Sequence, residues 1–356
     1  MQNILFVVSF PKKLHSSARF RIELYEKILD DNNFLYSTEY FWDQETYKLL
    51  YKKGNSAAKF SGLIKGFFGR LRLLFKVRKY DYIFILREAT PAGLPFFEWA
   101  CAKVFRKKII YDFDDAIWVS QTSKSNPIAK ILKATWKVKL ICTWAYKVSV
   151  GNQYLYAFAE KYNKNVVLNP TCVDTENMHN IIKDQKQEGR FVIGWTGSFS
   201  TLKFLNNILA VLQKLENKYE FDFLVIADQN PRLPLKNFIF KEWNESSEIN
   251  DLLQCNIGVM PLDDNEYAKG KCGFKLIQYM ALAIPVVASP VGVNKQIVDE
   301  GINGFLCRSD QEWIEALEKL LQDTELRSKM GLSGRKKIQQ FYSVASNKNN
   351  FISLFS

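Results

Sequence analysis

The sequence predicts an α/β fold made of two Rossmann-like domains, each a doubly wound parallel sheet, that face one another across a cleft. Three observations lead to this prediction. The chain has 356 residues, more than most single cores accommodate. Short apolar runs alternate with segments of helical periodicity along its whole length. A polar segment at 177–190 separates one such series from the next.

The first series predicts the N-terminal sheet. Its apolar runs are rich in Ile, Val and Phe, as expected for strands that are covered on both faces. Strands are predicted at 4–10, 82–86, 108–113, 147–151 and 166–168, with helices between them, for example at 18–29 and 95–105. No basic segment precedes the first run, so we interpret it as a strand and not as part of a signal peptide.

The second series predicts the C-terminal sheet. Strands are expected at 191–195, 221–227, 237–240, 257–260 and 284–289, and helices at 201–218, 246–254, 274–282, 310–322 and 324–341. We therefore expect an N-terminal domain over 1–180, a C-terminal domain over 181–342, and a tail over 343–356 that returns to the N-terminal domain. In such sheets ligands bind beside the carboxyl ends of the strands, so functional residues are expected in the loops there.

The net charge of +12 is concentrated in one part of the chain. Residues 51–150 hold 20 basic and 6 acidic side chains, whereas residues 191–356 hold 18 basic and 19 acidic ones. The N-terminal domain is therefore expected to meet an anionic partner, either a nucleic acid or an acidic membrane surface. The six cysteines are scattered without a CxxC pair, which indicates reduced thiols in the cytoplasm and argues against a disulfide or zinc framework. No apolar run reaches the length of a membrane span.

The segment 58–79 is the most basic amphipathic stretch, and it contains no acidic residue. Its apolar residues recur at helical spacing between lysines and arginines, a composition typical of a helix that lies in an anionic membrane surface. The residues expected to contact the membrane are Phe60, Lys65, Phe67, Phe68, Arg70 and Arg72. The alternative is an ordinary amphipathic helix that covers a sheet, and three glycines (Gly62, Gly66, Gly69) weaken the helix prediction. A second basic stretch, 129–140, belongs to the same domain.

Three loops of the C-terminal domain are predicted to converge on a phosphate. They are 194–203, 270–275 and 288–298, and each places a glycine after a strand or directly before a helix. Exposed N–H groups at a helix N-terminus bind anions, and nearby lysines neutralise their charge. There is no Walker motif, no GxGxxG after the first strand and no GxSxG. With only two histidines, a histidine-rich metal site is not expected.

Four segments, taken in order, resemble glycosyltransferase family 4, in particular its bacterial surface-polysaccharide type. They are LNPTCVDTE (168–176), IGWTGSFSTLKFL (193–205), EINDLLQCNIGVMPL (248–262) and GFKLIQYMALAIPVVASPVGVNKQIVDEGINGFL (273–306). The resemblance covers the C-terminal domain, while the N-terminal domain matches only loosely. It implies the GT-B fold, a nucleotide-sugar donor and transfer with retention of anomeric configuration.

The resemblance also implies which residues bind the donor. Lys203 is spaced from Gly197 as in the family, so it would contact the diphosphate. The expected donor-binding residues are Gly197, Ser198, Lys203, Gly270, Lys271, Gly273, Phe274, Lys275 and Gln278. Three positions depart from the family pattern: Ser198 replaces an arginine, and Gly270 and Gln278 replace two glutamates. Lys271 and Lys275 are expected to supply the missing positive charge, with Lys275 taking part in catalysis.

Three carboxylates in YDFDDAIW (111–118) form the other chemical cluster. Asp112, Asp114 and Asp115 follow a predicted strand, and we expect Asp114 or Asp115 to orient the acceptor hydroxyl or take its proton. Helix capping and metal binding are the alternatives. The family often has a histidine in the comparable loop, so this is another departure. In HSSARFR (15–21), which follows the first strand, His15, Arg19 and Arg21 are expected on the acceptor side. Arg19 or Arg21 would meet a phosphate of the acceptor, and the alternative is a surface arginine without a ligand.

Together these expectations describe a retaining glycosyltransferase that transfers a sugar to a polyprenyl-diphosphate-linked saccharide in cell-surface polysaccharide biosynthesis. It would need no cofactor and no metal, and it would lie on the cytoplasmic face of the cell membrane without binding nucleic acid. Two alternatives stay open. The basic domain would also suit a nucleic-acid-binding protein, and the substitutions at Gly270 and Gln278 would suit an inactive nucleotide-sugar binder.

Overall fold

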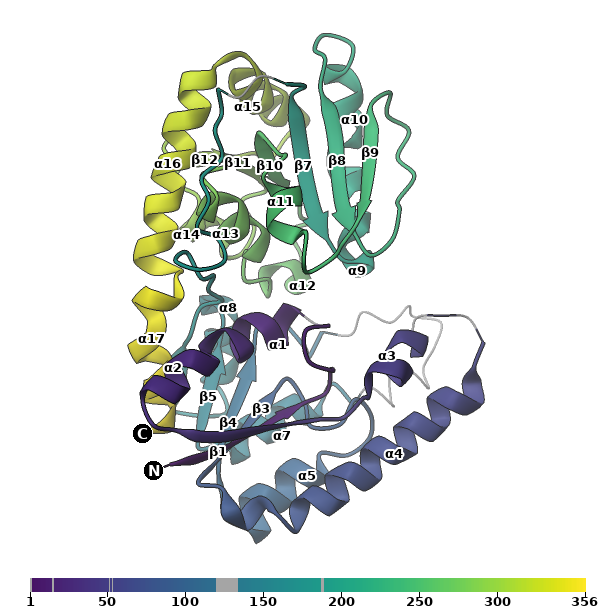
Figure 1. The fold of residues 1–356 in the computed structure, drawn as a ribbon, viewed down its shortest axis with the longest axis vertical. Helices are drawn as coiled ribbons and strands as arrows, with labels where there is room; N and C mark the ends of the chain where they lie inside the picture. The colour runs from purple at the N-terminus through teal and green to yellow at the C-terminus, as the bar shows by residue number, and fades with distance from the viewer. Residues whose placement is uncertain (1, 15, 51, 53, 120–133, 187–188) are drawn as a thin grey trace. The chain divides into compact units, whose positions relative to one another are not determined.

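The computed structural model describes residues 2–14, 16–50, 52, 54–119, 134–186 and 189–356. The chain divides into two compact units (Figure 1). Unit 1 comprises Met1–Thr171 and Lys348–Ser356, and unit 2 comprises Cys172–Asn347. The sequence analysis placed these divisions after 180 and after 342, so the structure moves both of them by a few residues. Residues 348–356 lie in unit 1.

Unit 1 contains a six-stranded parallel sheet in the order β2-β1-β3-β4-β5-β6. Its strands are β1 (Asn3–Val8), β2 (Leu35–Tyr40), β3 (Tyr82–Leu86), β4 (Lys108–Phe113), β5 (Lys147–Val150) and β6 (Val166–Leu168). The five strands predicted for this half are confirmed, and β2 was missed. The central strand β3 is buried along its whole length, as expected where helices cover both faces of a parallel sheet. β2 is an edge strand with a polar, half-buried sequence, LYSTEY.

Helices connect these strands. They are α1 (Ser16–Arg21), η1 (Glu23–Tyr25), α2 (Glu26–Asp31), α3 (Gln44–Leu50), α4 (Ser56–Leu74), η2 (Val77–Lys79), α5 (Phe96–Trp99), a π-helical turn η3 (Ala100–Val104), α7 (Lys137–Trp144) and α8 (Gln153–Ala159). The 19-residue α4 confirms the helix predicted within 58–79 and lies beside α3 and α5 (Figure 1).

Unit 2 contains a second six-stranded parallel sheet, in the order β12-β11-β10-β7-β8-β9. Its strands are β7 (Val192–Gly197), β8 (Asp222–Ala227), β9 (Phe238–Glu242), β10 (Ile257–Met260), β11 (Val286–Ala288) and β12 (Gly304–Leu306). The five predicted strands are confirmed, and the three-residue edge strand β12 was missed. Read from β9, the strands follow the order 3-2-1-4-5-6 of a dinucleotide-binding sheet.

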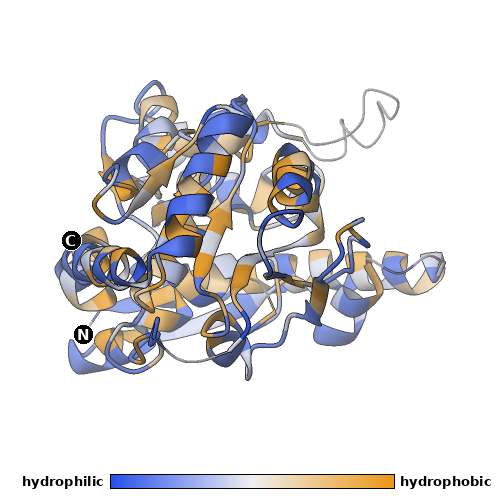
Figure 2. Ribbon diagram, turned by 90° about the horizontal axis from the view of Figure 1, so that it is seen from above, coloured by the Kyte–Doolittle hydropathy of each residue, from blue (hydrophilic) through white to orange (hydrophobic). Residues whose placement is uncertain are grey.

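The helices of unit 2 include all five that were predicted and two short ones, at 266–269 and 294–297, that were not. They are α9 (Phe199–Leu202), η4 (Lys203–Leu205), α10 (Asn206–Leu215), α11 (Glu248–Leu252), α12 (Glu266–Lys269), α13 (Phe274–Ala281), α14 (Asn294–Ile297), α15 (Asp310–Gln322) and α16 (Thr324–Phe341). Ser309 and Glu312 form a capping box at the start of α15, and Asp323 caps α16, which explains why their predicted bounds hold. One core joins β7, β8 and β10 to α10 and α15. Helices in Figure 2 carry both hydrophilic and hydrophobic residues along their length.

The chain ends in α17 (Val344–Ile352) and η5 (Ser353–Phe355). Phe351 stacks on Tyr25 with ring centroids 4.0 Å apart. Phe355 contacts the rings of Phe6 and Phe84 from two central strands of the sheet. Aromatic pairs of this kind add stability beyond the apolar area that they bury. The last residues therefore belong to the core of unit 1.

Candidate functional site

In unit 2 the strand order reverses between β7 and β10. Ligands of such sheets bind where the order reverses, beside the carboxyl ends of the strands. Gly197 is the last residue of β7, and Met260 is the last residue of β10. The loops that follow them carry two of the three segments predicted to bind phosphate. The topology therefore places Ser198 and Lys203 at the same edge of the sheet as the segment 270–275.

The turn after β7 is built around a close contact. A Cβ atom on Gly197 would lie 2.4 Å from the Trp195 ring, so the backbone can take this course only with glycine. Ser198 and Thr201 then form a capping box that starts α9. The N–H of Phe199 donates to Oδ1 of Asp228 at 2.6 Å. Asp228, which follows β8, was missed by the sequence analysis, and its carboxylate accepts an N–H from the loop 194–203 that was predicted to bind phosphate.

Three predicted lysines gather around two aromatic rings at this edge. Nζ of Lys203 lies 5.7 Å from the ring centroid of Tyr267, and Nζ of Lys271 lies 4.4 Å from the same centroid. Nζ of Lys275 lies 5.2 Å from the ring of Trp195, the residue that packs against Gly197. Cations are attracted to the faces of aromatic rings at such distances. The structure thus brings Lys203, which comes from the first loop, next to a lysine from the second.

The start of α13 depends on Gly273. This residue has a left-handed φ of 68°, and a Cβ atom there would lie 2.2 Å from Cδ1 of Ile297. The N-cap residue of α13 is this glycine, which has no side chain to cap the helix, and Phe274 and Lys275 form the first turn. Gly270 ends α12 three residues earlier. The first N–H groups of α13 therefore start beside the lysines, in the arrangement that stabilises a bound anion.

The third predicted loop reaches the same place. Gly292 follows β11 with φ 54°, and a Cβ atom on it would lie 2.8 Å from the carbonyl oxygen of Lys269. The loop 288–298 therefore packs against the end of α12, directly before the segment 270–275. All three loops predicted from the sequence meet at one edge of the sheet.

Gln278 lies one turn further along α13, and it is buried. Its Nε2 donates to Oε1 of Glu248 at 3.1 Å, and Trp243 Nε1 donates to the same oxygen at 3.1 Å. The exposed fraction is 3% for Gln278 and 6% for Glu248. The predicted contact of Gln278 with a ribose stays a prediction. Glu248 was missed, although it is the first residue of a quoted motif.

The carboxylate cluster of unit 1 lies at the carboxyl end of β4. Nε of Arg87 lies 2.9 Å from Oδ1 of Asp114, and a second guanidinium nitrogen of Arg87 pairs with Asp115. Ser17 Oγ donates to Asp114 at 2.6 Å. Arg87 directly follows β3 and has a left-handed φ of 62°, which is unusual for a non-glycine residue and common at functional sites. The sequence analysis missed Arg87. Its position could have indicated a role, because it is a charged residue directly after a predicted strand.

Asp112 has a different role from its two neighbours. It is fully buried, and Arg21 Nε donates to its Oδ2 at 2.9 Å. Burial raises the pKa of Asp112, and the Arg21 guanidinium opposes that shift. Arg21 also donates to the carbonyl oxygen of Asn169. The expectation that Arg21 meets an acceptor phosphate is therefore wrong, because 1% of its side chain is exposed and its nitrogens are bonded within unit 1.

The other two acceptor-side residues are less informative. Arg19 is buried, with its guanidinium 4.9 Å from the ring of Phe20, so the structure gives no exposed phosphate-binding surface at this residue. His15 lies outside the described residues. No group of three or more His, Cys, Asp or Glu side chains that could hold a metal occurs within the described ranges.

Helix α4 presents Gly62 and Gly66 inward and a row of apolar side chains outward. Gly62 and Gly66 are buried, and a Cβ atom on either would overlap Thr46 or the ring of Phe41. The outward row consists of Phe60, Ile64, Phe68, Leu71 and Phe75, with Phe75 86% exposed. We call these five residues the apolar row. Lys65 and Arg72 are exposed on the same helix.

Two residues predicted to contact a membrane do not belong to this outer face. Arg70 is 4% exposed and donates to the carbonyl oxygens of Val8, Glu39 and Ala89. Burial lowers its pKa to about 10. The prediction for Arg70 is therefore wrong, because its donors satisfy backbone carbonyls at strand ends. Phe67 is half-buried against Phe41, at 5.4 Å between ring centroids. Nowhere in the described part of the chain is a helix both long and apolar enough to span a membrane.

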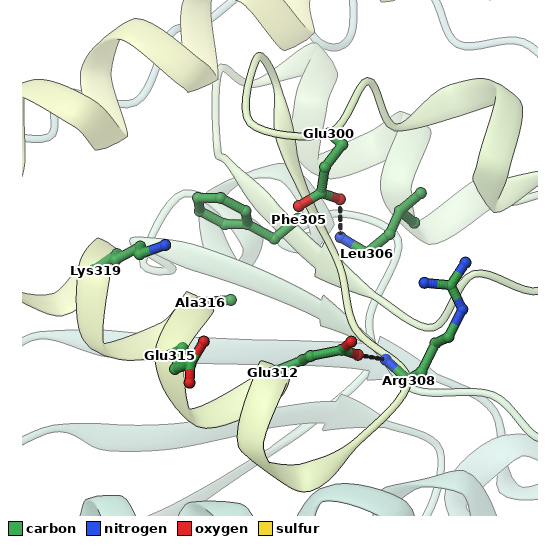
Figure 3. A pocket seen from close by; sticks show the side chains of 8 residues that line it. All are labelled: Glu300, Phe305, Leu306, Arg308, Glu312, Glu315, Ala316 and Lys319. Carbon is green, nitrogen blue, oxygen red and sulfur yellow. Dashed lines mark hydrogen bonds between the residues drawn. The ribbon is translucent and has the colours of Figure 1, made fainter.

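Figure 3 shows a pocket of about 420 Å³ beside the edge strand β12 and helix α15. Its charged side chains are Glu300, Arg308, Glu312, Glu315 and Lys319. Glu300 accepts a hydrogen bond from the N–H of Leu306 at 2.7 Å, and Glu312 accepts one from the N–H of Arg308. None of the predicted donor-binding residues lines this pocket. Its carboxylates make it unsuited to a diphosphate.

Comparison with known proteins finds a family model and a curated relative that match part of this chain. Residues 190–323, within unit 2, match the family model described as "Glycosyl transferases group 1". The human alpha-1,3/1,6-mannosyltransferase ALG2 is 27% identical over 134 residues. That match covers 37% of this chain and 30% of the length of ALG2.

Solved structures resemble the whole chain. Sucrose-phosphate synthase from Thermosynechococcus elongatus has a TM-score of 0.74 at 14% identity, covering 100% of this chain and 98% of that one. A glycosyltransferase from Rickettsia africae has a TM-score of 0.70 at 14% identity, covering 99% and 97%. Anabaena HepE, solved in complex with UDP and glucose, has a TM-score of 0.69 at 16% identity and covers 99% of both chains. The two six-stranded parallel sheets therefore form the GT-B fold.

Proposed function

We propose that this protein is a retaining glycosyltransferase that transfers a sugar from a nucleotide-sugar to a lipid-linked saccharide in the synthesis of a cell-surface polysaccharide. The observation that carries the proposal is the set of three lysines beside Tyr267 and Trp195. They lie where the strand order of unit 2 reverses, within the segment that matches the glycosyltransferase family model. The complex of HepE with UDP and glucose supports a nucleotide-sugar as the donor class.

Unit 2 would act on the donor mainly through electrostatic stabilisation of the leaving group. When the glycosidic bond of a nucleotide-sugar breaks, negative charge develops on the leaving diphosphate. Lys203, Lys271 and Lys275 would neutralise that charge, and the N–H groups at the start of α13 would donate hydrogen bonds to it. We expect no metal cofactor, because these ammonium groups supply the positive charge that a cation would otherwise provide. Gln278, whose amide nitrogen is bonded to Glu248, would offer its carbonyl oxygen to a ribose hydroxyl.

Unit 1 would bind the acceptor. Asp114 and Asp115 would accept hydrogen bonds from the acceptor sugar, and one of them would orient or deprotonate the attacking hydroxyl. Arg87 and Ser17 hold Asp114 in place, so this carboxylate is oriented before the acceptor binds. The similarity to a lipopolysaccharide outer core galactosyltransferase, with a TM-score of 0.63, agrees with a surface saccharide as acceptor.

Helix α4 would attach the protein to the cytoplasmic face of the cell membrane. The apolar row combines Phe, Ile and Leu side chains, which favour insertion among acyl chains, and exposed basic residues flank it. A nucleic-acid groove would instead need aromatic rings that stack on bases beside a continuous basic track. Ile64 and Leu71 cannot stack in that way, so we favour a lipid surface and expect no nucleic acid as partner.

Thermal-shift measurements with UDP-, GDP- and dTDP-sugars test the donor site. A ligand that binds only the folded state raises the melting temperature, so one class of nucleotide-sugar should raise it. Replacing Lys275 with Ala should remove that shift, while the melting temperature without ligand stays the same. No shift with any nucleotide-sugar would refute the proposal. A shift without transfer to any lipid-linked saccharide would favour an inactive nucleotide-sugar binder.

A further inference from the structure

Unit 1 contains a groove of about 730 Å³ between helix α4 and the chain that follows β2. Its size lies within the range of small-molecule binding sites. One wall is formed by Tyr40, the last residue of β2, and by Phe41 and Trp42, which follow it. The other wall is formed by α4 residues, among them Phe68 and Gly69. The groove is thus lined by aromatic rings and by helix backbone.

The two glycines of the α4 wall differ in their surroundings. At Gly66 a Cβ atom would lie 2.5 Å from the Phe41 ring, so the helix packs there against the groove floor. At Gly69 a Cβ atom would meet no heavy atom within 4 Å. The helix surface at Gly69 therefore adjoins open space inside the groove. A hydrocarbon chain could lie along it without displacing a side chain.

The rim of the groove carries positive charge. Lys12, Lys65 and Arg72 contribute to its lining, opposed by Glu39 and Asp43. Asp43 accepts the N–H of Thr46 at 2.7 Å and pairs with Lys65 at 3.1 Å, and Lys12 pairs with Glu26 at 3.0 Å, so Arg72 supplies the rim charge that these two ion pairs do not engage. Aromatic walls below a cationic rim suit an amphiphile with an apolar chain and an anionic head group.

The position of the groove relates it to the acceptor site. Strands β2, β1, β3 and β4 are successive neighbours in the sheet. Three strand spacings of about 4.8 Å separate the end of β2 from the end of β4, or roughly 14 Å. Asp114 follows β4 at the same edge. Phe68, a member of the apolar row, also lines the groove, so the groove opens at the face proposed to meet the membrane.

We propose that this groove binds the polyprenyl chain of the lipid-linked acceptor, with the acceptor diphosphate at the rim formed by Lys65 and Arg72. This inference rests on the proposed function and adds the binding site for the lipid part of the acceptor. A chain held here leaves its head group on the same edge of the sheet as Asp114 and Asp115. An ordinary membrane lipid, by contrast, would contact the apolar row without entering the groove.

Binding of farnesyl diphosphate, a water-soluble polyprenyl diphosphate, tests this inference by titration calorimetry on the full chain. Gly69→Phe places a ring in the open part of the groove, whereas Ala58→Phe adds the same ring to the exposed start of α4, outside the groove. We expect Gly69→Phe to weaken binding at least tenfold and Ala58→Phe to leave it unchanged. Inorganic diphosphate alone should bind much more weakly than farnesyl diphosphate to the unaltered protein.

A charge variant tests the rim separately. Arg72→Glu should weaken binding of farnesyl diphosphate but not of farnesol, whereas Lys79→Glu, an exposed residue that does not line the groove, should change neither. Vesicles of phosphatidylglycerol should bind Gly69→Phe as well as they bind the unaltered chain. Equal affinity of Gly69→Phe and the unaltered chain for farnesyl diphosphate would overturn the inference, as would loss of vesicle binding in Gly69→Phe.

Failure of this inference can be told from failure of the proposed function. If the groove does not hold the chain, nucleotide-sugars should still raise the melting temperature of every variant. If the proposed function is wrong, no nucleotide-sugar should do so, whatever the result with farnesyl diphosphate. Circular dichroism melting shows whether Gly69→Phe is folded. If it is not, the binding of farnesyl diphosphate and farnesol to Arg72→Glu tests the groove instead.

Discussion

Nε2 of Gln278 lies 3.1 Å from Oε1 of Glu248, and both side chains are buried in unit 2. Gln278 stands where the resembled family has a glutamate. Its amide group is bonded to the carboxylate of Glu248, the first residue of helix α11. An amide donor facing a carboxylate is favourable, whereas two carboxylates at this distance would repel each other. The substitution at 278 is thus part of a local arrangement that includes Glu248.

Restoring the family residue with Gln278→Glu should destabilise the protein. Two buried carboxylates would face each other, and we expect a loss of about 1–3 kcal/mol in the free energy of unfolding. One carboxyl would acquire a raised pKa in the folded state, so the loss should be largest near neutral pH and shrink as the pH falls toward about 5. Thermal unfolding at several pH values measures this. The double variant Glu248→Gln with Gln278→Glu should recover part of the stability, and a further loss would contradict the pairing.

Replacing Lys275 with Ala should lower the rate of sugar transfer by about a hundredfold or more, the usual effect of removing one group that stabilises transition-state charge. Its Nζ contacts the Trp195 ring at the edge of the sheet and is not part of the core, so the melting temperature should change little. Transfer assays with the nucleotide-sugar identified by thermal shift give the rate. Lys329→Ala, at an exposed lysine of α16 outside the three loops, is the control and should retain full activity.

Replacing Arg87 with Gln should impair acceptor binding more than donor binding. Asp114 and Asp115 would lose a shared cation while they stay mostly buried, so we expect a loss of about 2 kcal/mol in stability and a higher KM for the acceptor. The KM for the nucleotide-sugar should stay the same. Arg87→Lys keeps the charge but cannot reach both carboxylates in the same way, and it should give an intermediate result. Equal changes in both KM values would argue against a role in the acceptor site.

Membrane binding should depend on the apolar row of α4. The triple variant Phe60→Ser, Phe68→Ser and Phe75→Ser removes exposed rings, each worth about 2 kcal/mol when buried in an apolar medium. Flotation with anionic vesicles should fall more than tenfold, and the melting temperature should hold or rise. Phe341→Ser, at a half-exposed phenylalanine of α16 in unit 2, should leave flotation unchanged. Vesicle binding by the triple variant equal to that of the unaltered chain would rule out this face.

Glu98 should make stability fall as the pH rises. It is fully buried, its Oε1 accepts the N–H of Ala89 at 3.0 Å, and its Oε2 has no hydrogen-bond partner among the described residues. Burial raises its pKa above the ordinary value of 4.5, so the folded state holds the proton more tightly than the unfolded state. The stability that this proton gives is present at low pH and is lost as the pH rises through the raised pKa.

Glu98→Gln should remove this dependence. The variant keeps an oxygen that can accept the N–H of Ala89, but it has no charge to bury. Compared with the unaltered chain, its melting temperature should be higher near pH 8 and similar near pH 5. Parallel curves for the two proteins from pH 5 to 8 would show that the carboxyl does not titrate in the folded state.

The sequence predicted ten of the twelve strands of the two described sheets, because most of these strands leave apolar runs rich in Val, Ile and Phe. It missed β2 because an edge strand with one solvent-exposed face can be polar. It missed β12 because GFL begins with a glycine and lacks the β-branched residues of β6 (VVL) and β11 (VVA), which were predicted. It also identified the loops around Gly197, Gly273 and Gly292. Glycine is needed there because the backbone takes a left-handed conformation or passes close to other atoms, and a glycine before a helix is visible in the sequence.

The sequence could not predict which charged residues lie inside the protein. Arg21 and Arg70 look like ligand-binding or surface residues in the sequence, and both are buried by partners that lie tens of residues away along the chain. Arg87, Asp228 and Glu248 have roles that arise only because the fold brings strand ends together. Spacing along the chain does not record such contacts.

The sequence by itself therefore determined two parallel α/β sheets and the three glycine-containing loops where a phosphate would bind, because periodicity and glycine conformation are local properties. The tertiary structure decided the rest. It joined Lys203 and Lys271 at Tyr267, paired Gln278 with Glu248, and turned Gly62 and Gly66 of α4 inward so that Phe60, Phe68 and Phe75 face outward. These outcomes depend on which surfaces pack together, and packing is decided by contacts between residues distant in sequence.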